Sequence, residues 1–487
     1  MPDESFQRSC RNEFDLPLLG LLGSMLDQLP AGSAALLRPL PSDFDPGRDD
    51  VDLLLSDATR TALLQMLATD AGRMDPSEAT QSDDSDLRCF HFRVVQIRPE
   101  KICLTIWDRC CRSLLRIDLW SEFRQFRTWP SIGIPAEELL AMSTCTGHTN
   151  ERPGIPLLRP DIHFCLLVLH LASKRKSLST SVTRERLWHA FDRLRLWAID
   201  EAGDLSQLLT LAESLLNAAA LSSTAIAAAE AYLLAEVAPP SRSPTQRIMR
   251  MVQNVEGELG HWWLKQVRCV AIDGSDGAGK STLVRLLCCS MAESVRPVVA
   301  KKLYRRSLTY QLVHSALRRL TGFDRCKVDD QLAFFTTIRA AVRLWCSFLW
   351  TAIRNRVARR TTLLLDRSVG SFLIQNRKSR CLSMISGWSW ILRFVPPMTN
   401  VLLRVPWPTL KARKQEMSEI SHESYQLHLW LLFTRHHPFD VFVFDNTLPG
   451  DLAADCLLKM LALTAIPLPE SDAISLPCQP SPEEVAA

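Results

Sequence analysis

Three glycines and a lysine stand between an apolar run and a helical run in VAIDGSDGAGKSTLVRLL, residues 270–287. The pattern G-x-x-x-x-G-K-[ST] is matched there by Gly274, Gly279, Lys280 and Ser281. In this pattern the backbone N–H groups of the loop wrap a phosphate chain at a helix N-terminus, where larger side chains would block the approach. The lysine brings positive charge to the phosphates, and the hydroxyl ligates Mg²⁺. The residue types therefore predict a site for a nucleoside triphosphate and magnesium.

Residues around this pattern complete the predicted site. We expect the nucleotide to be held by Gly274, Asp276, Gly277, Gly279, Lys280, Ser281 and Thr282. A second apolar run, 361–365, ends on Asp366, and a carboxylate at the carboxyl end of a parallel strand lies beside such a loop. Asp366 and Ser281 are therefore the predicted Mg²⁺ ligands. Arg367, the next residue, is expected to contact phosphate.

Strands and helices at the right places must position these residues. Residues 267–272 form a short apolar run rich in β-branched side chains, which indicates a buried strand, and 281–288 has apolar residues at helical spacing. The order strand, glycine loop, helix is the context in which the phosphate-binding pattern is meaningful. We predict an α/β fold with a parallel sheet for this part of the chain.

The same stretches resemble the thymidylate kinases and related nucleoside monophosphate kinases. IDGSDGAGKST is similar to the opening of that family, with Asp273 and Asp276 at its two acidic positions. LAFFTTIRAAVRLW resembles the helix in which the family keeps an arginine beside the acceptor base, and Arg339 falls there. TTLLLDRSVGSFLIQ resembles the strand and Asp-Arg-Tyr motif, with Ser368 replacing the tyrosine.

The resemblance covers residues 266–463 and implies an activity. It implies ATP and Mg²⁺ as cofactors, Lys280, Asp366, Arg367 and Arg413 as catalytic residues, and Asp273, Arg339 and Arg367 as substrate-binding residues. TNVLLRVPWPTLKARKQE resembles the strand and arginine-bearing helix before the family's lid, which is the basis for Arg413. Arg404 stands where the family usually has an acidic residue, so the acceptor stays open. A homodimer is a further possible partner arrangement that the sequence leaves undecided.

The composition is that of an ordinary globular protein. Apolar residues make up 47% and charged residues 23% of 487 residues, and the net charge of +4 gives no indication of nucleic-acid binding. The N-terminus is acidic and polar, where a signal peptide would be basic and then apolar, so we expect a cytoplasmic protein. No stretch reaches the roughly 20 apolar residues that a membrane-spanning helix needs. The predicted partner is a small nucleotide or phosphorylated acceptor.

Two domains are predicted, separated by a segment rich in proline and serine. We assign residues 1–236 to an α+β domain with a helical tail, 237–248 to the linker, 249–465 to the kinase-like domain and 466–487 to a flexible tail. In the first domain, strands are predicted at 34–37, 51–55, 90–97, 102–106 and 114–119, and helices from about residue 159. We expect each half to have its own core and to be separable.

A candidate second metal site lies in the first half. Asp50 and Asp52 flank a valine at the head of an apolar strand, so their side chains share a face, and LLRIDLW supplies Asp118 from another strand. The segment 32–177 is similar to the nucleotidyltransferase fold, whose aspartates hold Mg²⁺ for attack on a nucleotide. That family has a Gly-Ser turn before the first aspartate, where this chain has PLPSDFDPGR. An acidic turn before a core strand is the other interpretation.

Three functions are consistent with these patterns. The first is ATP-dependent phosphoryl transfer by the C-terminal half to a nucleotide-like or phosphorylated acceptor. The second is an ATPase or nucleotide switch, with the N-terminal half as a binding module. The third is a bifunctional kinase and nucleotidyltransferase. Dependence of ATP turnover on an acceptor would distinguish the first from the second.

Overall fold

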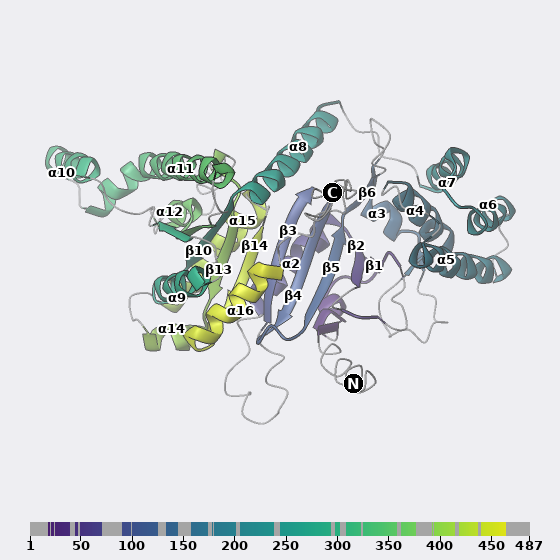
Figure 1. The fold of residues 1–487 in the computed structure, drawn as a ribbon, viewed down its shortest axis with the longest axis horizontal. Coiled ribbons are helices and arrows are strands. Elements are labelled where there is room, and N and C mark those ends of the chain that lie inside the picture. Colours follow the sequence, from purple (N-terminus) through teal and green to yellow (C-terminus); the bar gives the residue numbers. More distant parts are fainter. Residues whose placement is uncertain are drawn as a thin grey trace, which may run out of the picture.

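The structure is a computed structural model, and it describes 18–463 except 20, 24, 39–43, 47–48, 71–89, 99, 125–132, 145–156, 174–177, 179, 201–204, 238–243, 294–297, 302–307, 323–324, 358–361, 376–391, 393, 414–417 and 437–439. The predicted tail, 466–487, and half of the predicted linker, 238–243, lie outside the described residues. The chain forms a mixed α/β protein around one large twisted sheet (Figure 1).

The N-terminal half contributes seven described strands to the large sheet. They are β1 (Ala34–Leu36), β2 (Asp50–Leu55), β3 (Phe90–Arg98), β4 (Lys101–Asp108), β5 (Leu114–Trp120), β8 (Ser143–Thr144) and β9 (Leu157–Leu158). A separate two-stranded sheet is formed by β6 (Glu122–Arg124) and β7 (Gly133–Pro135). All five predicted strands of this half are confirmed, within two residues at each end.

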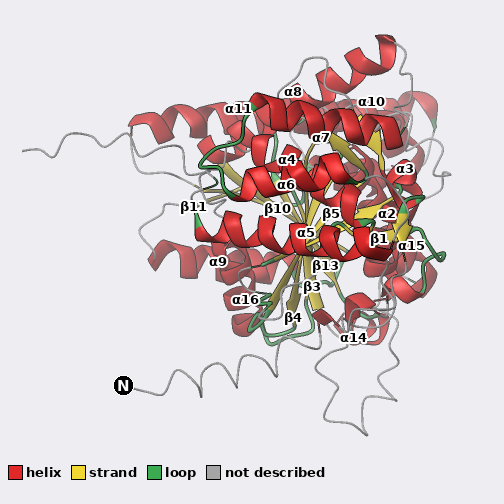
Figure 2. Cartoon of the chain, turned by 90° about the vertical axis from the view of Figure 1, so that its right-hand side faces the viewer, coloured by secondary structure: helices red, strands yellow, loops and turns green. Residues whose placement is uncertain are grey.

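Helices follow in the order that the sequence predicts. The strands of the N-terminal half alternate with α2 (Asp57–Asp70) and α3 (Ala136–Leu140), and α4 (Pro160–Ser173), α5 (Ser181–Asp200), α6 (Ser206–Leu216) and α7 (Ser223–Glu236) come after them. The last four pack on one another and on the sheet through a core that includes Phe164, Leu194 and Leu233. Figure 2 shows this helical layer facing the viewer.

The C-terminal half forms a five-stranded parallel sheet in the order β11-β12-β10-β13-β14. Its strands are β10 (Arg268–Gly274), β11 (Val298–Lys301), β12 (Thr362–Asp366), β13 (Thr399–Arg404) and β14 (Val441–Asp445). Its helices are α8 (Pro244–Gln266), α9 (Lys280–Glu293), α10 (Leu308–Thr321), α11 (Arg325–Val357), α12 (Val369–Gln375), α14 (Trp407–Arg413), α15 (Glu419–His436) and α16 (Gly450–Leu463).

Side chains on the parallel strands alternate between two hydrophobic cores. On β14, Val441 and Val443 face one core, whereas Phe442 and Phe444 face the other. The first core is covered by α11, α12 and α15, and the second by α9 and α16. Period-two alternation in a sheet buried on both faces gives the nearly continuous apolar runs from which these strands were predicted.

The two halves are joined into one sheet by β14 and β3. These strands pair in antiparallel fashion, with Val441 opposite Val94 and Val443 opposite Phe92. At the start of β14, the Arg93 guanidinium makes two hydrogen bonds to the Asp440 carboxylate, of 2.6 Å from Nε and 3.1 Å from Nη2. Both side chains are largely buried, with 12% and 5% of their surface exposed.

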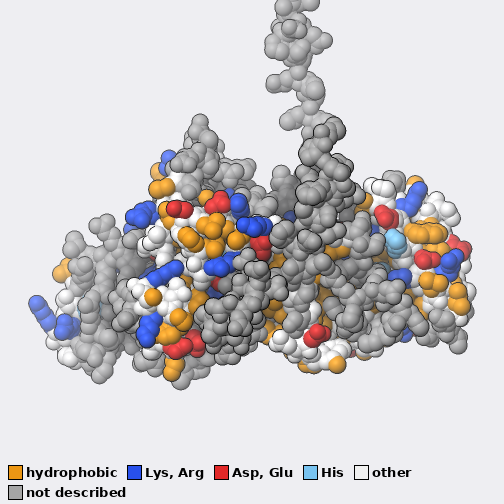
Figure 3. All heavy atoms as spheres, turned by 90° about the horizontal axis from the view of Figure 1, so that it is seen from below, with side chains coloured by type: hydrophobic (Ala, Val, Ile, Leu, Met, Phe, Trp, Pro, Cys, Tyr) orange, Lys and Arg blue, Asp and Glu red, His pale blue; other side chains and the backbone are white. Residues whose placement is uncertain are grey.

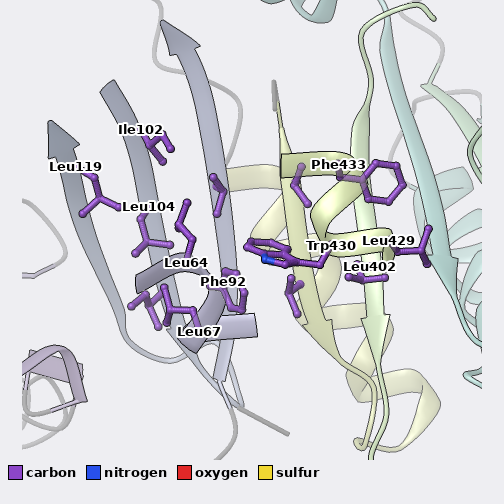
Figure 4. Packing of buried hydrophobic residues seen from close by; sticks show 14 of the residues in the cluster. Leu64, Leu67, Phe92, Ile102, Leu104, Leu119, Leu402, Leu429, Trp430 and Phe433 are labelled. Atoms are coloured by element: carbon purple, nitrogen blue, oxygen red, sulfur yellow. The ribbon is translucent and has the colours of Figure 1, made fainter. Parts of the chain in front are cut away.

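The core is also shared across this junction. Phe92 of β3 and Trp430 of α15 meet edge to face, with ring centroids 5.4 Å apart. Figure 4 shows Trp430 on the side of Phe92 and Leu64, in the same core cluster as Leu67 of α2. Arg404 at the end of β13 reaches into the N-terminal half, donating to the carbonyl of Phe90 at 3.3 Å. Arg404 therefore makes a contact between the two halves.

The two halves therefore share one sheet and one hydrophobic core, in contrast to the expected separate cores, and their separability stays a prediction. Without β3, strand β14 would present an unpaired edge, and the core beneath it would be open to water. The predicted linker also differs, because α8 begins at Pro244, within the segment assigned to it. Proline is well tolerated in the first turn of a helix, which explains how a proline-rich stretch begins one.

Among the described helices, none is both long and apolar enough to span a lipid bilayer. The view from below in Figure 3 shows Lys and Arg side chains interspersed with Asp and Glu over the C-terminal half. On the face seen there, the basic side chains do not gather into one patch.

Candidate functional site

The glycine loop lies between the end of β10 and the start of α9, as the sequence predicts. Its three glycines all have positive φ, which is 153° at Gly274, 93° at Gly277 and 85° at Gly279. Residues with a side chain rarely adopt these conformations, so glycine is required for the turn itself. The loop ends where α9 begins, so the first N–H groups of α9 are available to an anion.

Two of the glycines are also required by close neighbours. A Cβ atom added at Gly279 would lie 2.7 Å from Nδ2 of Asn446, and one at Gly274 would lie 3.0 Å from the carbonyl oxygen of Leu403. The ends of β13 and the segment after β14 therefore press against the loop. This packing supports the loop on the side of β13 and β14.

Lys280 is buried under the loop and bonded to the loop itself. Its ammonium donates to the carbonyl oxygens of Gly274 at 2.8 Å and Ser275 at 2.7 Å, and Asp276 lies 3.7 Å away. Burial, aided by the positive charge of Arg367, lowers the pKa of Lys280 to about 8. A desolvated ammonium group is stabilised by nearby negative charge, so this lysine favours an anionic ligand.

Ser281 and Asp366 come together at the mouth of the loop. The Ser281 hydroxyl donates to the Asp366 carboxylate at 3.1 Å, although the two residues are 85 positions apart in the sequence. A hydroxyl and a carboxylate side by side are oxygen ligands of the kind that Mg²⁺ prefers, with phosphate oxygens and water completing the set. The residues present therefore fit the predicted magnesium ion and nucleotide.

Arg367 lies over the loop in a conformation that costs energy. Its φ is +85°, which is rare for a residue with a side chain, and its backbone N–H donates to the carbonyl of Ile272 at 3.0 Å. Its guanidinium forms a 2.5 Å ion pair with Asp276 of the loop. Strained residues of this kind concentrate at functional sites, and this one holds a cation at the loop's rim.

Asp273, which the sequence analysis places among the substrate-binding residues, lies in the interior beside the loop. The side chain is fully buried, and its Oδ1 accepts hydrogen bonds from the backbone N–H of Ser368 at 3.0 Å and from the Ser371 hydroxyl. Burial raises the pKa of this carboxyl group. Ser368 immediately precedes α12, so Asp273 ties β10 to the start of that helix, and its role in substrate binding stays a prediction.

Two residues that the sequence analysis did not identify support the loop. Asn446, just after β14, donates from Nδ2 to the carbonyl of Ala278 at 2.6 Å. His422 of α15 contacts the Ser275 hydroxyl with Nδ1 at 2.7 Å and the Val405 carbonyl with Nε2 at 2.9 Å. A carbonyl oxygen only accepts, so Nε2 carries the proton and Nδ1 accepts from the serine. Burial lowers the pKa of His422, which keeps this neutral form.

Of the remaining predicted residues, Arg413 reaches the loop and Arg339 does not contact it. Arg413 donates to the carbonyl of Asn446 at 3.2 Å, and its Nη1 lies 3.9 Å from the position of a Cβ at Gly279. Arg339 is exposed on α11, with no hydrogen bond or ion pair to another described residue. Thr282 is exposed in the first turn of α9.

The three aspartates of the candidate second site do come together. Asp52 pairs directly with Asp118 across β2 and β5, and Asp50 is on the same face of β2. Arg38 binds Asp52 through Nε at 2.7 Å, and Lys101 forms an ion pair with Asp118. Burial and the two neighbouring aspartates raise the pKa of Asp50.

Two of the three carboxylates, those of Asp52 and Asp118, are therefore already paired with basic side chains of the chain. No group of three or more His, Cys, Asp or Glu side chains among the described residues is arranged to hold a metal ion. The face was identified correctly, but its negative charge is matched by cations that the sequence analysis did not place there. Because Asp52 and Asp118 are held in ion pairs and the described residues offer no metal-binding group, the second metal site is not supported.

The fold and the site together define a mixed α/β protein with a strand, glycine loop and helix arranged to bind phosphate. No family model matches the chain, and no curated protein is significantly similar to it. Among solved structures, the chain is similar to thymidylate kinase from Ehrlichia chaffeensis, with 16% sequence identity and a TM-score of 0.29. That match covers 40% of this chain and 98% of the other.

Proposed function

We propose that the chain binds ATP with Mg²⁺ on the phosphate loop and transfers a phosphoryl group to a small phosphorylated or nucleotide-like acceptor. The observation that carries the proposal is the buried ammonium of Lys280 next to the Ser281 and Asp366 pair. A phosphate chain in the loop would give this cation a stronger anionic partner than the two carbonyls it now contacts.

Each side chain of the site has a role in this proposal. Lys280 and the N–H groups at the start of α9 bind the phosphates, and Ser281 and Asp366 hold the metal ion, which neutralises phosphate charge when bound. Arg413 lies close enough to the loop to neutralise charge from the side of β14. Catalysis of this kind is mostly positioning and charge stabilisation, for which fixed cations are well suited.

The acceptor is proposed to bind on the side of β12. Arg367 follows that strand, and its ion pair with Asp276 can be exchanged for a phosphate of the acceptor. Arg339 on the exposed face of α11 supplies a second cation for an anionic acceptor. Which acceptor is bound is a question for direct measurement with nucleotides, nucleosides and sugar phosphates.

A second candidate function is an ATP-driven switch, and one observation favours it. Asn446, just after β14, contacts the phosphate loop, and β14 itself pairs with β3 of the N-terminal half. A change at the loop on nucleotide hydrolysis could therefore reach the N-terminal half. In this case ATP turnover would not depend on an acceptor.

The test measures ADP formation in the presence of a panel of acceptors, and binding of a non-hydrolysable ATP analogue with Mg²⁺ by calorimetry. We expect turnover to depend on one class of acceptor, and Lys280→Ala to reduce it by about 10³-fold or more while the protein remains folded. The matched control is Lys459→Ala, which removes an exposed lysine paired with Asp455 on α16. Full activity in folded Lys280→Ala would refute the proposal, and acceptor-independent turnover would favour the switch.

A further inference from the structure

The turn between β4 and β5, residues 109–113, lies at the same edge of the sheet as the phosphate loop. Strand β3 is antiparallel to both β14 and β4, so β4 runs parallel to β14. The register places Asp108, the last residue of β4, opposite Phe90 at the start of β3. In open α/β sheets, ligands bind beyond the carboxyl ends of the parallel strands. The N-terminal half thus adds one more loop to the edge where the nucleotide is proposed to bind.

A buried histidine fixes this turn to the end of β14. His91 of β3 has no exposed surface and stacks on Phe444, with ring centroids 4.3 Å apart. Its Nδ1 accepts from the backbone N–H of Asp445 at 3.0 Å, and its Nε2 lies 2.9 Å from the carbonyl oxygen of Arg109. Because one contact is with a donor and the other with an acceptor, the ring is neutral with its proton on Nε2.

The side chain of Arg109 returns across the turn toward β14. Its Nη2 lies 3.4 Å from the Thr447 hydroxyl, a long hydrogen bond. Its Nε is shielded from solvent and has no hydrogen-bond partner among the described residues, and no carboxylate among them forms an ion pair with it. The Arg109 side chain is only partly buried and makes a single long hydrogen bond among the described residues, so its terminal N–H groups can donate to an acceptor that a ligand would supply.

The other side of the same segment contacts the phosphate loop. Asn446, the neighbour of Thr447, donates to the carbonyl of Ala278 and accepts from Arg413. Strands β12 and β13 flank β10 on opposite sides, with the Ser281 and Asp366 pair on the side of β12. If the transferred phosphate lies beside that pair, the nucleoside part of the ligand extends the other way, toward the segment after β14.

We infer that Arg109 of the N-terminal half binds the nucleoside part of the nucleotide, donating hydrogen bonds to its ribose or base. The inference rests on the proposed function, because it takes its ligand from there. It makes the site a product of both halves, in which the turn after β4 forms one wall and the phosphate loop another. The N-terminal half then contributes directly to nucleotide affinity.

The experiment compares two ligands by calorimetry, a non-hydrolysable ATP analogue with Mg²⁺ and inorganic tripolyphosphate with Mg²⁺. Tripolyphosphate fills the phosphate loop but has no nucleoside for Arg109 to contact. We expect Arg109→Ala to lower the affinity for the analogue by about 10-fold or more and to leave the affinity for tripolyphosphate unchanged, because the hydrogen bonds from a charged donor to the nucleoside are lost. Arg109→Lys keeps the charge but loses the forked donors, so its affinity for the analogue should lie between those of the original protein and Arg109→Ala. This variant replaces Arg109→Ala in the test if the alanine variant does not fold.

The matched control is Arg112→Ala, which removes the same charge from an exposed position in the same turn and should change neither affinity. If both Arg109 variants bind the analogue as tightly as the original protein, the inference is wrong and the proposed function stands. Equal weakening of both ligands would also overturn it, since Arg109 would then act only by supporting the loop. If the original protein binds neither ligand, the proposed function fails as well.

Discussion

Removing the Arg93 side chain should measure how strongly the two halves are joined. The guanidinium and the Asp440 carboxylate make two hydrogen bonds, and the same carboxylate accepts a 2.6 Å hydrogen bond from the Thr399 hydroxyl. With 5% of its side chain exposed, Asp440 has little access to water when Arg93 is lost. Breaking a buried ion pair by removing one partner typically costs 3–5 kcal/mol, because the other charge stays buried. We therefore expect Arg93→Ala to lower the free energy of unfolding by roughly 3–5 kcal/mol.

The assay is urea unfolding followed by circular dichroism, for Arg93→Ala, Asp440→Ala and the double variant. The double variant should be less destabilised than the sum of the two single changes, since the second removal leaves no further charge unpaired. The matched control is Arg195→Ala, whose ion pair with Asp192 is exposed, and it should change stability by no more than about 0.5 kcal/mol. A loss below about 1 kcal/mol, or full additivity in the double variant, would refute the idea that this pair holds the junction.

Two further predictions concern the phosphate loop and its link to the N-terminal half. Gly279→Ala should lower the affinity for the ATP analogue at least about 10-fold in calorimetry, because a Cβ there would lie 2.7 Å from Asn446 and the residue has a φ of +85°. An unchanged affinity would contradict the described loop geometry. Burial lowers the pKa of His91 to about 4 from 6.5, so the unfolded chain takes up a proton there first, and the free energy of unfolding should fall as pH drops from about 6.5 to 4. Urea titrations should show that the free energy of unfolding falls by up to about 3 kcal/mol over that pH range, and His91→Gln should make this dependence on pH weaker. If the free energy of unfolding of the variant depends on pH as strongly as that of the original protein, other groups are responsible.

The sequence was sufficient for those parts of the site that follow from local rules. The glycine loop was predicted from residue spacing, and Asp366 from its place at the end of an apolar strand. The same strand-end rule applied to VFVFDN would have found Asn446. His422 had no such signal, because it lies on a helix and meets Ser275 across 147 positions. The burial of Asp273 likewise depends on α12, whose first residues approach it only in the folded chain.

The charges of the N-terminal half show a different limit. The spacing of Asp50 and Asp52 correctly predicted a shared face, and the strand pairing with Asp118 confirms it. A metal site requires in addition that no other cation neutralises the cluster, and Arg38 and Lys101 do so from two other strands or their ends. Sequence patterns report which residues are present on a face, whereas the balance of charge depends on every element packed around it.

The pairing of β14 with β3 determines when this protein can complete its fold during synthesis. Arg93 and Asp440 are 347 positions apart, so more than 300 further residues must be translated after β3 before its partner strand β14 emerges from the ribosome. Until then β3 is an unpaired edge strand, and the apolar side chains beneath it are exposed to other nascent chains. The N-terminal half is therefore expected to need protection by a chaperone while the rest is translated. Truncated or prematurely terminated chains should aggregate through this edge.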